Sequence, residues 1–472
     1  MGGILNLEIW QLAILAVGAV GALVLAAINF RFSILLVGAM LFLSAISTQL
    51  TWNLRLVRTI ITEFQQQRSP MYLAAGALLL LAGVMHVQKL KIRSVSGVAI
   101  LLAFSGLYAG LIRMLAADIG EGMQSIGFAV ATLAPLMLVP SALIRDWWDM
   151  YVLPRVVAVV GLGWCSLCML QFVSNRRALT TGYLTQRFVG MTANPQIAAA
   201  FLAFTITSCI FLVLNDPKRT FRLLWIGTAA LSSVFLLWTA SRTGIAMAGI
   251  GVLACFYGRA GVGAVMLPIV AGVAYFAYTF LSGQRVDFDV ERLSGGGQTR
   301  YAAWRELWGD FTSNPLFGIG GTGVKEAFRA EKSENSLLYG LASYGAGMGV
   351  VIVLMLLASV LQCLRVLRLR GQMLSYQRRI AEFVIGSQAM FWAGSVFEGY
   401  IVGRVSAPIV FMMLFTAMAQ RTIDLVTEQA GAGSFDEAVD PEGVAWDRED
   451  QTDQSPYGDY GNSPRPASVP GV

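Results

Sequence analysis

Long apolar runs alternate with short polar connectors along almost the whole chain. The runs are roughly 16–25 residues long, about the length that an α-helix needs to cross a hydrocarbon core. The pattern predicts an all-α, polytopic transmembrane helical bundle of about 12–13 helices, in which residues 9–47 hold one or two crossings. The expected spans are 9–30, 32–47, 70–87, 95–116, 123–143, 152–174, 197–214, 223–240, 245–258, 262–281, 337–364, 380–403 and 405–420.

The basic connectors predict how these helices are oriented. "KLKIR" (89–93), "NDPKRTFR" (215–222) and "LRVLRLRGQMLSYQRR" (364–379) hold the densest clusters of Lys and Arg in short loops. An even number of spans separates each from the next, so all three can face the cytoplasm. We therefore expect a multi-pass inner-membrane protein whose segments 48–69, 175–196 and 281–336 face outward, with a cytoplasmic C-terminus.

The large outward loop, residues 281–336, differs from the other connectors. "TRYAAWRELWGDF" (299–311) places apolar residues at 301, 304, 307, 308 and 311, the spacing of an amphipathic helix. Pro315 and Gly318 then end this pattern. We expect a folded periplasmic loop containing short helices, within a membrane domain of residues 1–424. Residues 425–472, rich in Gly, Asp, Glu, Ser and Pro, are expected to form a disordered, acidic cytoplasmic tail.

Composition supports the membrane assignment and narrows the chemistry. The chain is 56% hydrophobic and only 13% charged, which excludes an ordinary soluble domain. Its net charge is +6 although the acidic tail is negative, so the membrane body is basic and suits anionic lipids and phosphates. No cleavable signal peptide is expected at the N-terminus, and nothing indicates a nucleic-acid partner.

Histidine and cysteine chemistry is not expected. The one histidine, His86, lies at the cytoplasmic end of a span beside "KLKIR", which excludes a histidine base at the outer face. All five cysteines lie in or at the end of apolar runs, including the CxxC pair Cys165 and Cys168, where thiols behave as small hydrophobic groups. We expect no metal and no cofactor. "GIGGTG" (318–323) matches GxGxxG, but no βαβ unit surrounds it.

Ionisable residues gather instead at the predicted outer face. Charges near a membrane are costly and often mark function. Guanidinium groups in such a place suit a diphosphate, because they bind phosphate oxygens bidentately. The alternative is that these arginines extend to the interface or pair with nearby acids. The residues in question are Arg113, Asp118, Arg187, Arg242, Glu398 and Arg404.

Four segments, in this order, resemble the bacterial O-antigen ligase and O-antigen polymerase family. They are "RFVGMTANPQIAAAFL" (187–202), "LLWTASRTGIAMA" (236–248), "TRYAAWRELWGDFTSNPLFGIGGTG" (299–323) and "ENSLLYGLASYGAGMG" (334–349). The resemblance implies a metal-independent inner-membrane glycosyltransferase. Such a protein takes a glycan from undecaprenyl diphosphate at the periplasmic face and passes it to an acceptor hydroxyl. By this resemblance Arg187 and Arg300 bind the diphosphate. Arg242, at the outer turn between two spans, is a further candidate for the same role.

The chain departs from the family at Glu334-Asn335, where the ligases usually have histidine followed by Asn or Ser. A carboxylate within reach of the acceptor hydroxyl can orient or deprotonate it, so Glu334 is the catalytic candidate. The alternative reading is a carboxylate stabilised by the N-terminal end of the following helix. The remaining candidates, with an acceptor-side or structural role, are Asn335, Arg305, Glu398 and Arg404.

The sequence therefore favours an enzyme that polymerises or ligates undecaprenyl-diphosphate-linked glycans for O-antigen, capsule or exopolysaccharide. The missing histidine inclines the choice toward a polymerase. A ligase acting on lipid A–core is the alternative, and a flippase or transporter, or a scaffold that acts through its tail, are the rivals. Expected partners are the lipid-linked donor, a glycan or lipid A–core acceptor, membrane lipids and other polysaccharide-assembly proteins.

Overall fold

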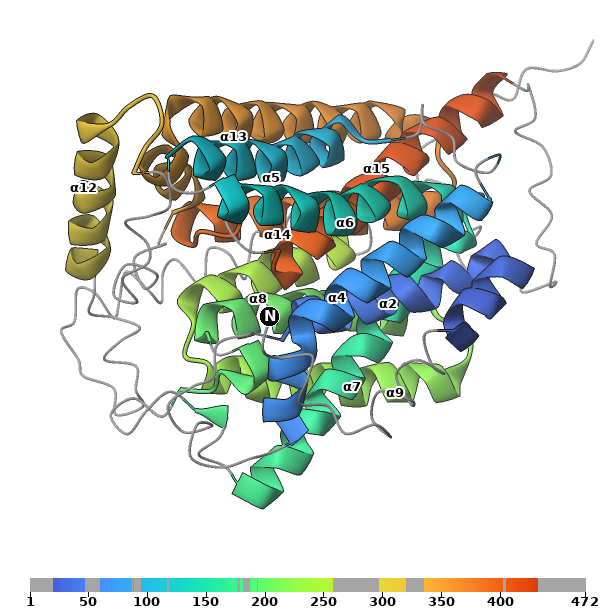
Figure 1. Cartoon of the computed structure of the whole chain (residues 1–472). Helices are drawn as coiled ribbons and strands as arrows, with labels where there is room; N and C mark the ends of the chain where they lie inside the picture. Colours follow the sequence, from blue (N-terminus) through green and yellow to red (C-terminus); the bar gives the residue numbers. More distant parts are fainter. Residues whose placement is uncertain are drawn as a thin grey trace, which may run out of the picture. The chain divides into compact units, whose positions relative to one another are not determined.

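The fold is a bundle of long helices, seen here in a computed structural model (Figure 1). The structure describes residues 20–46, 60–86, 88, 95–116, 119–175, 179–180, 187–192, 194–257, 297–319, 335–401 and 405–431. The α-helices are α2 (Ser33–Ser44), α4 (Ile60–Met85), α5 (Gly97–Ala116), α6 (Ile119–Leu143), α7 (Val152–Asn175), α8 (Pro195–Asn215), α9 (Arg219–Trp238), α12 (Gly297–Ser313), α13 (Ser336–Leu369), α14 (Ser375–Phe397) and α15 (Ala407–Gly431). A further helix, Arg242–Tyr257, follows α9, and short 3-10 turns include η5 (Asp149–Tyr151) and η7 (Gly190–Thr192).

The predicted all-α membrane bundle is confirmed. Nine helices within the described part of the chain are long and apolar enough to cross a membrane, and Phe30–Ser44 and Arg242–Tyr257 are shorter apolar helices. The amphipathic helix predicted at 299–311 is present as α12. The expected span 262–281 and residues 9–19 of the span 9–30 lie outside the described residues.

Several helices run beyond the predicted limits, and α4 and α15 do so furthest. α4 begins at Ile60, inside the segment predicted as an outward loop, and contains Pro70 within its length. α15 continues to Gly431, past the predicted domain boundary at 424, and residues 432–472 lie outside the described part. Apolar length alone marks the part of a helix that can lie in lipid, so polar extensions such as "IITEFQQQRS" are missed by a hydropathy pattern.

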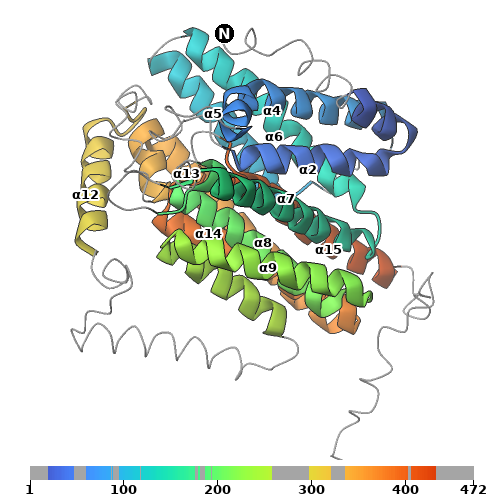
Figure 2. The same cartoon turned by 90° about the horizontal axis from the view of Figure 1, so that it is seen from below.

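α8 and α15 form the centre of the bundle. The apolar windows of these two helices are 78% and 83% buried, against 33% for α9 and α13. Stacked aromatic rings join them: the ring centroids of Phe204 and Phe411 are 4.4 Å apart, and Phe415 stacks on both. Figure 2 shows α7, α8 and α9 running side by side, in agreement with their mutual contacts. Aromatic packing of this kind fixes which faces of neighbouring helices meet.

α13 is broken at Gly345, and residues 315–319 fill the break. Gly345 has φ +76° and ψ −172°, values that interrupt the helix and that a side chain would disfavour. The amide of Ile319 donates to the carbonyl of Ala342 at 2.9 Å, and the amide of Ala346 donates to that of Pro315 at 2.8 Å. Backbone groups freed by the break are therefore satisfied by the turn that ends α12. α12 runs across the axis of α13, as Figure 1 shows.

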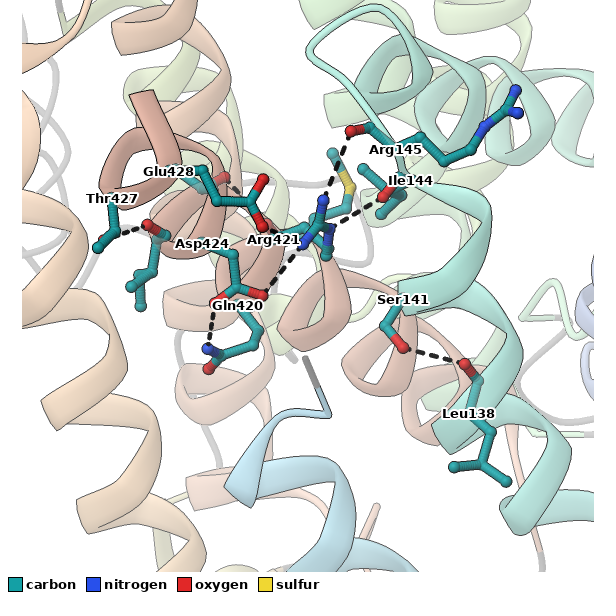
Figure 3. A network of polar contacts seen from close by, with 12 residues as sticks. Leu138, Ser141, Ile144, Arg145, Gln420, Arg421, Asp424, Thr427 and Glu428 are labelled. Carbon is teal, nitrogen blue, oxygen red and sulfur yellow. Dashed lines mark hydrogen bonds and ion pairs between the residues drawn. The ribbon is translucent and has the colours of Figure 1, made fainter. Parts of the chain in front are cut away.

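The C-terminal half of α15 is fixed by Arg421, whose side chain is only 3% exposed. Its Nε donates to the carbonyl of Ile144 at 2.9 Å and Nη2 donates to that of Arg145 at 3.4 Å, just past the end of α6 (Figure 3). Asp424 accepts from Nη1 at 3.2 Å. This cluster joins α15 to the α6–α7 connection. We call this end of the bundle the Arg421 end, and the end where α13 starts the Asn335 end.

Candidate functional site

The start of α13 is fixed to the turn that follows α14. Asn335 caps the helix: its Oδ1 accepts from the amide of Leu338 at 2.9 Å. Its Nδ2 donates to the carbonyl of Val396 at 2.8 Å. Next to it, the buried Ser336 donates from Oγ to the carbonyl of Glu398 at 2.7 Å. The backbone that directly follows Glu334 therefore has a defined position.

The turn after α14 carries Glu398 and Tyr400, both buried. The amide of Tyr400 donates to Ser336 Oγ at 2.9 Å, which completes the connection to α13. The Tyr400 hydroxyl lies 3.5 Å from the carbonyl of Gln196, near the start of α8. Three helix ends, those of α8, α13 and α14, thus meet around this turn. Asn335 and Glu398, both predicted as site residues, are brought together here.

Arg187 holds the turn between α9 and the helix Arg242–Tyr257. Its Nε donates to the carbonyl of Thr239 at 2.8 Å, and Nη2 donates to that of Ala240 at 3.4 Å. These carbonyls end α9, where a cation is favoured by the helix dipole. Ala240 has φ +49°, a conformation uncommon for a residue with a side chain.

The same turn begins the next helix. The amide of Gly244 donates to Oγ of Ser241 at 3.2 Å, which is an N-cap interaction. Arg242 is the first residue of that helix. Arg187 and Arg242 therefore flank a single turn, one at the end of α9 and the other at the start of the following helix.

The other predicted site residues are less fully described. Arg305 is exposed on α12. Arg300 belongs to the first turns of α12, but its side chain is not among the described ones. Glu334 and Arg404 lie outside the described residues. Their roles remain predictions from the sequence.

Sequence reasoning missed two polar residues of α4 that reach the same end of the bundle. Arg68, 5% exposed, donates from Nε to the carbonyl of Leu43 at 3.0 Å and from Nη2 to that of Val405 at 2.7 Å. Gln65 is fully buried and donates to the carbonyl of Met191 at 3.1 Å. No hydrophobic pattern could reveal them, because they lie in the polar extension of α4. Gln65 thereby joins α4 to η7, and Arg68 joins it to the segment before α15, so both belong to the framework of the site.

Within the described residues, no three His, Cys, Asp or Glu side chains lie close enough together to hold a metal ion. Cys165 and Cys168 are free and buried, and the Cys165 sulfur lies 3.5 Å from the hydroxyl of Ser232. The chemistry of the described site is therefore that of guanidinium, amide, hydroxyl and carboxylate groups.

Comparison with known proteins identifies one segment. Residues 227–346 match the family model described as O-antigen ligase. The match runs from α9 to the break in α13 and so includes the turn at 239–242, α12 and the start of α13. No curated protein matches the chain. The resemblance to the O-antigen ligase and polymerase family, based on short motifs, is confirmed by this match.

Proposed function

We propose, from the O-antigen ligase domain that this chain carries in residues 227–346, that it transfers a glycan from undecaprenyl diphosphate to an acceptor hydroxyl at the periplasmic face of the inner membrane. One observation carries the proposal. The matched segment contains Arg242, Arg300 and Glu334-Asn335, and it reaches the Asn335 end of the bundle. The family match supports an enzyme of the O-antigen ligase or polymerase type, and the donor, the face and the residue roles are our proposal.

The donor diphosphate would bind at the turn between Arg187 and Arg242. The helix Arg242–Tyr257 starts there, and the amides of a helix N-terminus favour an anion. A guanidinium has five N–H donors, of which Arg187 directs Nε and Nη2 at the carbonyls that end α9. Those two bonds keep the turn in place for the ligand. The cations would stabilise the charge that develops on the departing diphosphate, and Arg300 would add a third.

The acceptor would lie near Glu334. The acceptor oxygen attacks the anomeric carbon, the bond from that carbon to the diphosphate oxygen breaks, and the hydroxyl proton passes to the Glu334 carboxylate. Carboxylates do the same for water in inverting glycosidases. The hydrogen bonds of Asn335 and Ser336 hold the adjacent backbone against the turn of Glu398. Reactive groups held in a fixed geometry react faster than free ones.

The test is a strain that lacks this chain and is complemented with Glu334→Gln. Glu331→Gln, three residues earlier in the same segment, is the matched control. We expect surface glycans of normal length with the control and no extended glycan with Glu334→Gln. Normal chain lengths with Glu334→Gln would exclude the role of Glu334 as the base.

The uncomplemented strain separates the remaining alternatives. Single repeat units attached to lipid A–core would identify a polymerase, which the missing histidine favours. Full-length polymer stranded on undecaprenyl diphosphate would identify a ligase. Lipid-linked units trapped in the cytoplasmic leaflet would instead indicate a flippase.

A further inference from the structure

The second part of α13, after Gly345, presents a stripe of apolar side chains that no other described helix covers. The stripe advances by four and three residues in turn, so it follows one face of the helix. Its side chains are between 43% and 57% exposed. They are Val350, Leu354, Leu357, Leu361 and Leu364. A continuous exposed apolar face on a membrane-spanning helix contacts lipid chains.

The stripe continues directly into two arginines. Arg365 lies four residues after Leu361, and Arg368 lies four after Leu364, so both are on the stripe's face one turn further on. Both are exposed. Arg365 follows the Gly345 break by about 20 residues, or roughly 30 Å of helix, which equals the thickness of a hydrocarbon core. The arginines therefore fall where the headgroups of the leaflet at the Arg421 end would lie.

These two arginines differ from their neighbours in their contacts. Within the described part of the chain, the guanidinium groups of Arg365 and Arg368 make no hydrogen bond or ion pair, although both residues lie in α13. By contrast, Arg370 is 2.6 Å from the carboxylate of Glu382, and Arg378 donates to the carbonyl of Met373 at 2.9 Å. The segment 364–379 holds five arginines and no acidic residue. Two guanidinium groups one turn apart, beside a lipid-facing surface, match a phosphate at the membrane interface.

We propose that Arg365 and Arg368 bind the headgroup phosphate of an anionic phospholipid, whose acyl chains lie along the apolar stripe of α13. A lipid fits this surface better than a free anion does, because only a lipid covers the stripe and the arginines together. The site is at the Arg421 end, opposite the proposed transfer site. It does not depend on the proposed function.

The binding can be measured by native mass spectrometry of the full chain in neutral detergent, with phosphatidylglycerol and phosphatidylcholine added at equal concentration. We expect the unmodified protein to retain phosphatidylglycerol preferentially, and R365Q/R368Q to reduce that preference about three- to tenfold, because bidentate phosphate contacts are lost. Lys218→Gln with Arg219→Gln is the control. It removes two charges at the start of α9, also at the Arg421 end, and should leave most of the preference.

Three results would overturn the proposal. An unchanged preference in R365Q/R368Q would exclude the site. An equal loss in the control would show that binding follows net charge alone. If inorganic phosphate displaces the bound lipid, and the protein retains the two lipids equally, a free anion is the ligand. R365K/R368K, which keeps the charge, provides a second variant if the glutamine variant fails to fold: it should retain part of the preference.

Discussion

Arg113 of α5 donates from Nη2 to the hydroxyl of Tyr344 at 2.8 Å, one residue before the break in α13. The same guanidinium reaches Ser125 of α6 at 3.3 Å. Because Tyr344 ends the first part of α13, this contact holds residues 336–344 against α5 and α6. That part of α13 begins at the capped Asn335, next to the proposed base. Arg113, far from Glu334 in the sequence, thus helps to fix the geometry of the proposed acceptor site.

The variant Tyr344→Phe should weaken this arrangement without disturbing the apolar packing. A hydrogen bond to a charged group contributes about 1.5–3 kcal/mol, so we expect a lower melting temperature and less extended glycan. Tyr257→Phe is the control, because the Tyr257 ring stays under the Arg370 guanidinium, whose carbon lies 5.1 Å from the ring centroid. Equal glycan products from the two variants would exclude a positioning role for Tyr344.

Replacing Gly345 by alanine should be strongly destabilising. A methyl group would contact the backbone of Leu316, and φ +76° disfavours any side chain. With ψ −172° this backbone conformation is one that only glycine readily adopts, and it alone costs a side chain about 1–3 kcal/mol, before the steric conflict with the inserted turn is counted. Thermal unfolding of the purified chain in detergent measures the effect.

Gly309→Ala is the matched control for that substitution. Gly309 lies within α12, where a methyl group would meet no atom within 4 Å. Alanine in an exposed helix position stabilises by about 0.5–1 kcal/mol relative to glycine. The two Gly→Ala variants are therefore expected to shift the melting temperature in opposite directions. If Gly345→Ala unfolds like the unmodified protein, the break is not a fixed feature of α13.

Two substitutions of Asn335 can separate the effects of its two side-chain hydrogen bonds. Asn335→Asp keeps the oxygen that accepts from Leu338 but loses the donor to Val396, whereas Asn335→Ala loses both. Removing an N-cap costs about 1 kcal/mol. We expect Asn335→Ala to lower the melting temperature more than Asn335→Asp does, and both to reduce glycan extension. If the Asn335→Ala protein is stable and produces glycans of full length, the N-cap does not position Glu334.

The elements of the fold follow from the sequence more readily than their connections do. The apolar run 95–116 predicted α5 within two residues, and the apolar spacing in "TRYAAWRELWGDF" predicted α12. The break at Gly345 was not predicted, because four glycines lie between 340 and 349 and only the contact with Leu316 distinguishes one of them. Hydrophobic patterns report burial, not which backbone groups a helix leaves unsatisfied.

The candidate site was predicted in part for the same reason. The sequence marked Arg187, Asn335 and Glu398 as polar residues near helix ends, and the structure brings Asn335 to the turn of Glu398. However, the partners of Arg187 are the carbonyls of Thr239 and Ala240, which carry no side-chain signal in the sequence. Arg68 was missed because its partners are also carbonyls, those of Leu43 and Val405.

Substitutions of Arg421 test what stabilises the Arg421 end of the bundle (Figure 3). Arg421→Ala removes the donors to Ile144 and Arg145 and leaves the Asp424 carboxylate without its cation. Removing one partner of a fully buried pair costs about 3–5 kcal/mol. Asp424 is 20% exposed, so we expect a loss below that range. R421A/D424A should be less destabilised than Arg421→Ala, because the only carboxylate it leaves near the site is that of the exposed Glu428.

Glu428→Gln is the control for this cluster. Glu428 is 55% exposed and lies 3.8 Å from Arg421, and exposed ion pairs contribute only about 0–1 kcal/mol, so its loss should hardly change the melting temperature. The measurement is a double-mutant cycle of thermal unfolding in detergent. If R421A/D424A is destabilised by the sum of the two single changes, the two side chains are not energetically coupled. The carbonyls of Ile144 and Arg145 would then account for the whole contribution of Arg421.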